Sequence, residues 1–179
     1  MRRHIGLGIG FFAVMCVASA GVAGFTQKSR AGRRTRISNK AEIEALEQRY
    51  LKAFNARDVS AIMENYAPGS ELFVFDAIPP REYPSWESYK KDCEGLFAAF
   101  PGPVHDTMSE LHITVVGPVA YAHHIEETHF TQKGGAPEVL VIRVTDVFRK
   151  MHGKWLIVQE HVSFPVDLST GKADLLSRP

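Results

Sequence analysis

The sequence predicts an α+β domain: a cone-shaped, curved antiparallel sheet wrapped around three N-terminal helices, with an internal pocket. Three segments with apolar residues at helical spacing lie between residues 39 and 100, with one short apolar run among them. Four long alternating segments follow between residues 104 and 164. Helices and strands that are segregated along a chain are typical of α+β layer folds, and short turns make consecutive strands antiparallel. Long strands that curl around helices leave a cone open at one end, which suits a small ligand.

Residues 1–36 are expected to be a signal peptide or N-terminal anchor plus a basic linker. The run from Ile5 to Phe25 carries no charge, and Ala18-Ser19-Ala20 is typical of a cleavage site. The same run is long enough to span a bilayer, so cleavage and anchoring both stay open. The five basic residues from Lys28 to Arg36 oppose export under the positive-inside rule. On balance we expect an exported protein, periplasmic or secreted, whose only membrane contact would be an uncleaved N-terminal segment.

Residues 37–179 are expected to form one acidic domain. Eight of the 21 Lys and Arg residues and none of the 20 Asp and Glu residues precede residue 42, so the chain from there carries a formal net charge of −7. This charge argues against nucleic acid as a partner. Cys16 lies in the N-terminal segment, and Cys93 falls on an apolar helical stripe, where it is expected to be a packed core thiol.

The three helices follow from their caps and their apolar spacing. Asn39 is expected to cap the first helix, with Glu42 as its capping-box partner and an end near Asn55. Asp58 is expected to cap a short second helix, and Ser85 a third. The apolar stripes are formed by Ile43, Leu46, Tyr50 and Phe54; by Val59, Ile62, Met63 and Tyr66; and by Trp86, Tyr89, Cys93, Leu96 and Phe100.

The strands follow from apolar runs and turn signals. Leu72 to Phe75 is a compact apolar run that Asp76 closes. Turn signals at Gly117-Pro118, Gly134-Gly135 and His152-Gly153 separate the later runs. These runs are Val104–Val116, Val119–Gln132, Glu138–Met151 and Lys154–Phe164.

Three stretches carry a family resemblance. Gln48–Asp58 reads QRYLKAFNARD, Tyr66-Ala67 and Phe75-Asp76 follow, and Gly153–Ser163 reads GKWLIVQEHVS. Together they resemble the SnoaL-like and ketosteroid isomerase-like branch of the nuclear transport factor 2-like superfamily. The resemblance covers about residues 40–166 and implies the cone-shaped fold, although one fold hosts many functions.

The resemblance also implies roles for single residues. Tyr50 matches the helix-one tyrosine that donates a hydrogen bond to the substrate oxygen in ketosteroid isomerases. Asp76 matches their general base, after two extra residues are allowed, and Asp146 falls near their protonated aspartate, with a gap of one residue. Arg143 and His161 are closer to the SnoaL-like pattern than to the isomerase pattern.

Asp76 is the first candidate for catalysis on its own chemistry. A carboxylate in an apolar mouth has its pKa raised by desolvation, which suits proton abstraction. The alternative is a loop cap, because aspartate before Ala-Ile-Pro-Pro can bond the backbone of its own turn. Tyr50 lies on the buried stripe of its helix, and its hydroxyl needs either a ligand oxygen or a backbone carbonyl.

The last two strands raise the question of which sheet face lines the pocket. Alternation places Arg143 and Thr145 on one side of their strand and Asp146 on the other, unless a β-bulge intervenes. Trp155 and His161 share one side of the last strand. We expect the Arg143/His161 face to line the pocket, with His161 as acid or base beside Asp76. Arg143 would pair with a carboxylate or bind a ligand carboxylate.

The opposite face, mostly apolar, is then expected to form a homodimer interface, with Asp146 structural. Trp86 and Tyr83 are expected to line the pocket or to be core aromatics. His123 and His124 point to opposite faces of a strand and cannot chelate one ion together. We therefore expect no metal and no cofactor.

The predicted function is binding of a small, largely apolar, carbonyl-bearing molecule. Acid–base isomerase, lyase or hydrolase activity would depend on Asp76, with Tyr50 or His161 supporting an enolate-like oxygen. The alternative is a non-enzymatic ligand-binding or oligomerisation module of the same fold. The sequence leaves open whether the protein is an enzyme.

Overall fold

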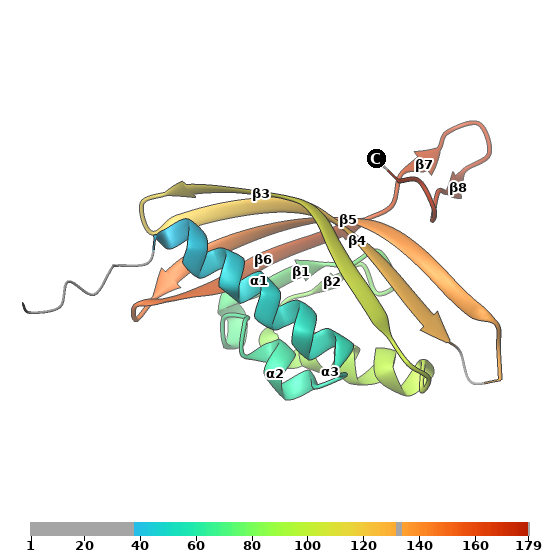
Figure 1. The fold of residues 1–179 in the computed structure, drawn as a ribbon, viewed down its shortest axis with the longest axis horizontal. Helices are drawn as coiled ribbons and strands as arrows, with labels where there is room; N and C mark the ends of the chain where they lie inside the picture. Colours follow the sequence, from blue (N-terminus) through green and yellow to red (C-terminus); the bar gives the residue numbers. More distant parts are fainter. Residues whose placement is uncertain (1–37, 132–133, 179) are drawn as a thin grey trace, which may run out of the picture. The chain divides into compact units, whose positions relative to one another are not determined.

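A six-stranded sheet in the order β2-β1-β6-β5-β4-β3 frames the domain in a computed structural model, which describes residues 38–131 and 134–178 (Figure 1). Its four long strands form the predicted antiparallel meander, which confirms the α+β fold with a curved sheet. The export or anchor segment predicted for residues 1–36 lies outside the described residues. The sheet strands are β1 (Phe73–Phe75), β2 (Glu82–Tyr83), β3 (His105–Val116), β4 (Val119–Thr131), β5 (Pro137–Met151) and β6 (Lys154–Ser163).

The short strand β1 joins the sheet in a way that the sequence did not predict. It pairs in parallel with β6, with Val74 opposite Glu160, and β2 then pairs antiparallel with β1. The sheet is therefore mixed. The pairing places the residues that follow β1, beginning with Asp76, next to the C-terminal half of β6.

The three predicted helices are present as α1 (Asn39–Asn55), α2 (Val59–Met63) and α3 (Trp86–Ala99). Asp58 caps α2, and Ser85 caps α3 in a reciprocal capping box, as predicted. The cap of α1 is Ser38 instead of Asn39, because the Ser38 hydroxyl accepts the Ala41 N–H at 3.2 Å. A 3₁₀ turn, η1 (Gly69–Glu71), leads into β1.

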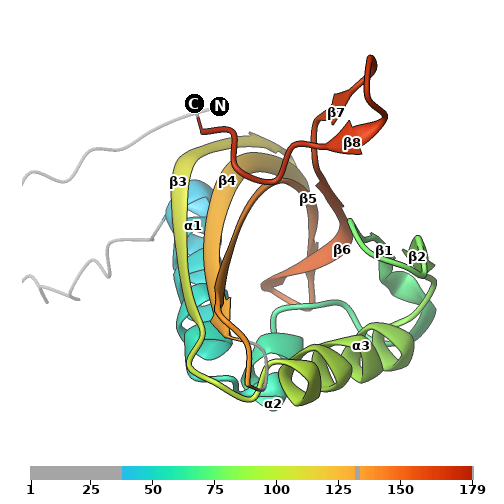
Figure 2. The same ribbon diagram turned by 90° about the vertical axis from the view of Figure 1, so that its right-hand side faces the viewer.

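The helices lie on the concave side of the sheet, as Figure 2 shows. α1 packs against β3, and α3 packs against α2, η1 and β2 on the side opposite the most curved part of the strands. Small side chains on β4, Ala120 and Ala122, are fully buried in the core. Ile43 and Leu46 of α1 and Phe148 of β5 complete the core around them.

A β-bulge in β6 reverses the alternation that the sequence suggests. Val147 of β5 lies opposite Gln159 and Phe148 lies opposite Ile157, so Val158 is an extra residue without a partner. Ile157 and Glu160 consequently both face inward.

The C-terminal segment runs back along the outside of the sheet. β7 (Val166–Asp167) and β8 (Lys172–Ala173) form a small hairpin. The Leu175 carbonyl accepts the Val141 N–H at 2.8 Å, and Arg178 pairs with Glu127 of β4 at 2.6 Å. Within the part of the chain that the structure describes, no helix is long and apolar enough to cross a membrane.

Candidate functional site

A cavity of about 230 Å³ lies between the concave face of the sheet and the helices α1 and α3. A water molecule takes about 30 Å³ in the liquid, so the cavity has room for a small molecule only. Its walls are largely apolar, which suits a ligand with hydrocarbon surface. They are formed by Phe54, Leu96, Phe100, Phe130, Leu140, Ile142, Val144, Ile157, Val162 and Phe164.

The three residues that the family resemblance singled out all line this cavity. Tyr50 comes from α1, Asp76 from the loop after β1, and Asp146 from β5. Their sequence separations are large, and the curved sheet brings them together. The structure therefore gathers the isomerase-like residues at one site.

The expectation that the Arg143/His161 face lines the pocket is wrong. Arg143, Thr145 and His161 are exposed on the outer face of the sheet, where Thr145 lies opposite His161 and the His161 ring packs against Phe75. The physical reason is the direction of sheet curvature. The other set of β5 side chains, which includes Asp146, faces the helices. Arg143 is therefore on the opposite face from Asp76.

The predicted aromatic lining residues lie outside the inner cavity. Tyr83 is buried and its hydroxyl donates to Asp92, while the Trp86 indole donates to the Met63 carbonyl at 2.9 Å. Trp155 is buried beside a more open hollow of about 730 Å³ between α1, α2 and the β5–β6 turn. That hollow is lined mainly by alanines and surface charges, so it lacks a convergent polar site.

The face that was expected to form a homodimer interface lines the cavity instead. Its apolar side chains, such as Val144 and Val162, contact the interior. Exposed apolar residues on the outer face gather near the β3–β4 turn, at Val116, Val119 and Tyr121. The homodimer itself stays a prediction.

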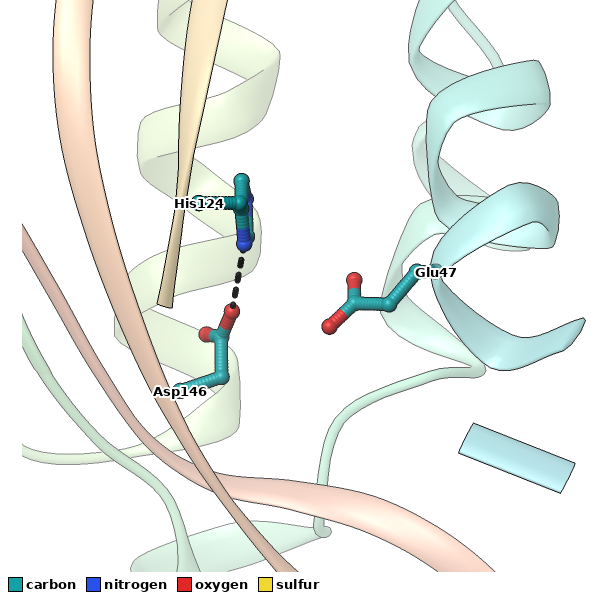
Figure 3. Close-up of side chains that lie close together, drawn as sticks. All are labelled: Glu47, His124 and Asp146. Carbon is teal, nitrogen blue, oxygen red and sulfur yellow. Dashed lines mark ion pairs between the residues drawn. The ribbon is translucent and has the colours of Figure 1, made fainter. Parts of the chain in front are cut away.

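The inner end of the cavity holds a cluster of ionisable groups, shown in Figure 3. Glu47 points from α1 toward His124 of β4 and Asp146 of β5, and the potential ligand atoms of the three lie within 4.8 Å of one another. The His124 Nδ1 is 3.8 Å from an Asp146 oxygen, and the His124 Nε2 is 3.1 Å from Glu126. Of the described residues, these three form the group that could hold a metal ion.

Burial changes the protonation of this cluster. Desolvation raises the pKa of Glu47 to about 7 and that of Glu126 to about 8. Desolvation also raises the pKa of Asp146 well above its usual value, helped by the neighbouring charge of Glu47, and lowers the pKa of His124. No Lys or Arg lines the cavity among the described residues. His124 is therefore the basic side chain beside these carboxyl groups, and no described Lys or Arg of the cavity lining balances their charge.

Glu160 of β6 lines the cavity beside β1, opposite Val74. Its two oxygens accept the hydroxyls of Tyr66 at 2.5 Å and Tyr89 at 2.6 Å. These bonds lower the pKa of Glu160, but desolvation is the larger effect and raises it. The two tyrosines fix the orientation of this carboxyl group.

Asp76 lines the cavity, and a backbone hydrogen bond holds one of its two carboxyl oxygens. Its Oδ1 accepts the Ala77 N–H at 2.5 Å. Desolvation raises its pKa despite the bonds from the loop backbone, which lower it. Burial also raises the pKa of Tyr50, so that its hydroxyl keeps its proton and can donate to a ligand oxygen.

Sequence reasoning missed Glu47, Glu126 and Glu160 as parts of the site. The spacing of residues along the sequence could have indicated two of them, Glu47 and Glu126. Glu47 follows Ile43 by four residues and therefore shares the buried face of its helix. Glu126 alternates in step with His124 on the inner face of β4.

The SnoaL-like domain family model matches residues 43–167, which is more than half of the chain. The chain belongs to the SnoaL-like domain family. The match contains every residue of the cavity named above. A comparison with curated proteins gave no match for this SnoaL-like protein.

Solved structures resemble the SnoaL-like domain over most of their length. An NTF2-like protein of unknown function from Pseudomonas putida KT2440 is 27% identical, with a TM-score of 0.70 over 80% of this chain and 99% of that chain. A ketosteroid isomerase-like protein from Erwinia carotovora atroseptica is 19% identical, with a TM-score of 0.59 over 69% and 93%. A candidate dehydratase of the NTF2-like family from Streptomyces avermitilis is 12% identical, with a TM-score of 0.62 over 70% and 97%. At these identities, the last two show the fold alone.

Proposed function

We propose that the SnoaL-like domain binds a small, largely apolar molecule with a carbonyl group and catalyses proton transfer at the carbon next to that carbonyl. The reaction would be an isomerisation or a lyase-type elimination. The observation that carries the proposal is that a carboxyl group, Asp76, and a phenol, Tyr50, face one small apolar cavity. The ketosteroid isomerase-like and candidate dehydratase neighbours support these two reaction classes by fold.

The roles follow from the chemistry of the two groups. The Asp76 carboxylate removes a proton from the carbon, and the electron pair of the broken C–H bond moves into the carbonyl to give an enolate. The Tyr50 hydroxyl donates a hydrogen bond to the enolate oxygen as charge develops there. In an isomerisation Asp76 returns the proton to another carbon. In an elimination a leaving group departs from the neighbouring carbon with its electron pair.

The test is hydrogen–deuterium exchange at the α-carbon of small enolisable ketones, followed by NMR with the full chain in D₂O. We expect Asp76→Asn to slow the exchange by about 10²–10⁴-fold, the usual contribution of a general base. His161→Gln is expected to leave the rate unchanged, because His161 lies on the outer face. Wild-type exchange in Asp76→Asn, or its loss in His161→Gln, would contradict the proposal.

One observation favours a second candidate, a ligand-binding module without catalysis. The hydrogen bond from Ala77 gives Asp76 the role of a loop cap. In this case ketones would shift cavity resonances in NMR spectra without any exchange at their α-carbons. The same spectra therefore distinguish a binding module from a catalyst.

A further inference from the structure

Three buried side chains at the inner end of the cavity direct lone pairs toward one another. Glu47, His124 and Asp146 are each at most 3% exposed. Glu47 Oε1, His124 Nδ1 and Asp146 Oδ1 have no hydrogen-bond partner among the described residues. Buried polar atoms almost always have a partner, and each one without a partner costs stability.

The position of the His124 proton strengthens this observation. The Nε2–H can donate to Glu126 at 3.1 Å, whereas the Nδ1 is 3.8 Å from Asp146, too far for a hydrogen bond. When Glu126 is ionised, the tautomer that makes this hydrogen bond carries its proton on Nε2. The Nδ1 lone pair then faces the two carboxyl groups of Glu47 and Asp146.

We propose that Glu47, His124 and Asp146 bind a divalent metal ion, with Zn²⁺ and Mn²⁺ as the fitting candidates. Imidazole and carboxylate together suit these ions, and three protein ligands leave a coordination position open. Two ligands of one Zn²⁺ lie at most about 4.2 Å apart, twice the bond length. The three groups lie within 4.8 Å, so small side-chain movements close the site.

The surroundings of the cluster fit a metal site in two further ways. The ionised Glu126 carboxylate would accept from the far nitrogen of His124, as carboxylates commonly do for metal-binding histidines, and so orient the ring. Among the described residues, six carboxyl groups and no Lys or Arg line the cavity. A bound cation would therefore balance the negative charge that these carboxyl groups carry when they are ionised. Two ionised carboxylates neutralise one divalent ion.

The inference deepens the proposed function and rests on it in one respect: the open coordination position would face the ligand's carbonyl oxygen. There the ion would polarise the carbonyl and acidify the neighbouring C–H bond. Asp76 and Tyr50 keep the roles given above, because neither belongs to the metal cluster. Metal binding itself is independent of any substrate.

The test is a calorimetric titration of the chelator-treated full chain with Zn²⁺ and, separately, with Mn²⁺. We expect one ion per chain for the wild type. Glu47→Gln and Asp146→Asn keep the shape of each side chain and should weaken binding at least about 100-fold, beyond the loss of 10–100-fold usual for supporting residues. Far-UV circular dichroism and urea midpoints first establish that each variant is folded.

Two variants serve as matched controls. Asp106→Asn removes another fully buried carboxyl group that lies outside the cluster. His123→Gln removes an outer-face histidine whose ring stacks on that of His112, with 5.1 Å between the ring centroids. This pair of histidines could bind zinc at the surface. Both variants should bind the ion within about twofold of the wild type.

Three outcomes would overturn the inference: no saturable binding by the wild type, wild-type affinity in Glu47→Gln and Asp146→Asn, or loss of binding in His123→Gln. Ketone exchange without metal binding would overturn the inference and leave the proposed function standing. Metal binding without ketone exchange, in both loaded and metal-free protein, would overturn the proposed function alone.

Discussion

Replacing Asp106 with asparagine is expected to remove the contribution of this residue to the stability that the wild-type domain loses as the pH rises from about 4 to about 8. Other buried carboxyl groups with raised pKa values, such as Glu47 and Glu126, keep their own contributions in the variant. Asp106 is 2% exposed, and desolvation, with the nearby Glu126 charge, raises its pKa from 3.8 to about 8. Between these values the folded state holds a proton that the unfolded chain has released. The stability from this group is full below the unfolded pKa and is lost as the pH rises through the folded pKa.

The expected size is about 1.4 kcal/mol per pH unit, or on the order of 5 kcal/mol over the whole interval. The asparagine side chain cannot ionise, so the unfolding free energy of the Asp106→Asn variant should exceed that of the wild type increasingly toward pH 8. The local contacts survive, because Thr128 donates to Oδ1 at 2.6 Å and Asn55 binds only the Asp106 backbone. The other charges near Asp106 are Glu126 and His124 on β4, and Tyr50 faces it from α1.

Urea unfolding at several pH values between 5 and 8 measures this difference directly. Glu138→Gln, which changes an exposed carboxyl group of β5, is the control and should keep the wild-type slope. A variant and wild type that differ by a constant amount at all pH values would mean that Asp106 is ionised in the folded protein.

Removing both hydroxyls that hold Glu160 is expected to destabilise the domain strongly. Tyr66 and Tyr89 are the donors to its two oxygens, and phenylalanine keeps the packing of each ring. A hydrogen bond to a charged group contributes about 1.5–3 kcal/mol. Each single change should therefore cost about 2 kcal/mol and the pair about 4 kcal/mol, because the carboxyl group is left buried without a donor.

Urea unfolding measures the loss, and Tyr121→Phe on the outer face should change the stability little. Adding Glu160→Leu to the double variant should restore part of the stability, since an apolar side chain needs no donor. A double variant within about 1 kcal/mol of the wild type would show that the tyrosine–carboxyl contacts contribute little.

The site was only partly predictable, as β4 shows. Its inner set is Ala120, Ala122, His124, Glu126, Thr128 and Phe130, and its outer set includes Val119, Tyr121 and Ile125. From hydrophobicity alone, the outer set would have been predicted to face the interior, because these apolar side chains are larger than the two alanines of the inner set. The inner face instead carries two small residues of the core and polar residues that belong to the site.

The amino-acid sequence was sufficient to predict the three helices, the apolar strand before Asp76, the four long strands and the pairing of these consecutive strands. The short elements η1, β2, β7 and β8 were not predicted. Local interactions fix the predicted features: caps such as Ser85, apolar spacing in the helices, and glycine turns between strands. Alternation also separated Arg143 from Asp146 correctly on β5. These properties depend on residues close together along the chain, where spacing alone sets the geometry.

Three features depend on the three-dimensional fold: which face of the sheet is concave, where the bulge shifts the alternation of β6, and which carboxyl groups lie together. The bulge at Val158 adds one residue without any glycine or proline to mark it. Glu47, His124 and Asp146 belong to three separate elements, and their meeting depends on the sheet curving over α1. Curvature arises from the twist of all the strands together, so no local pattern in the sequence encodes it.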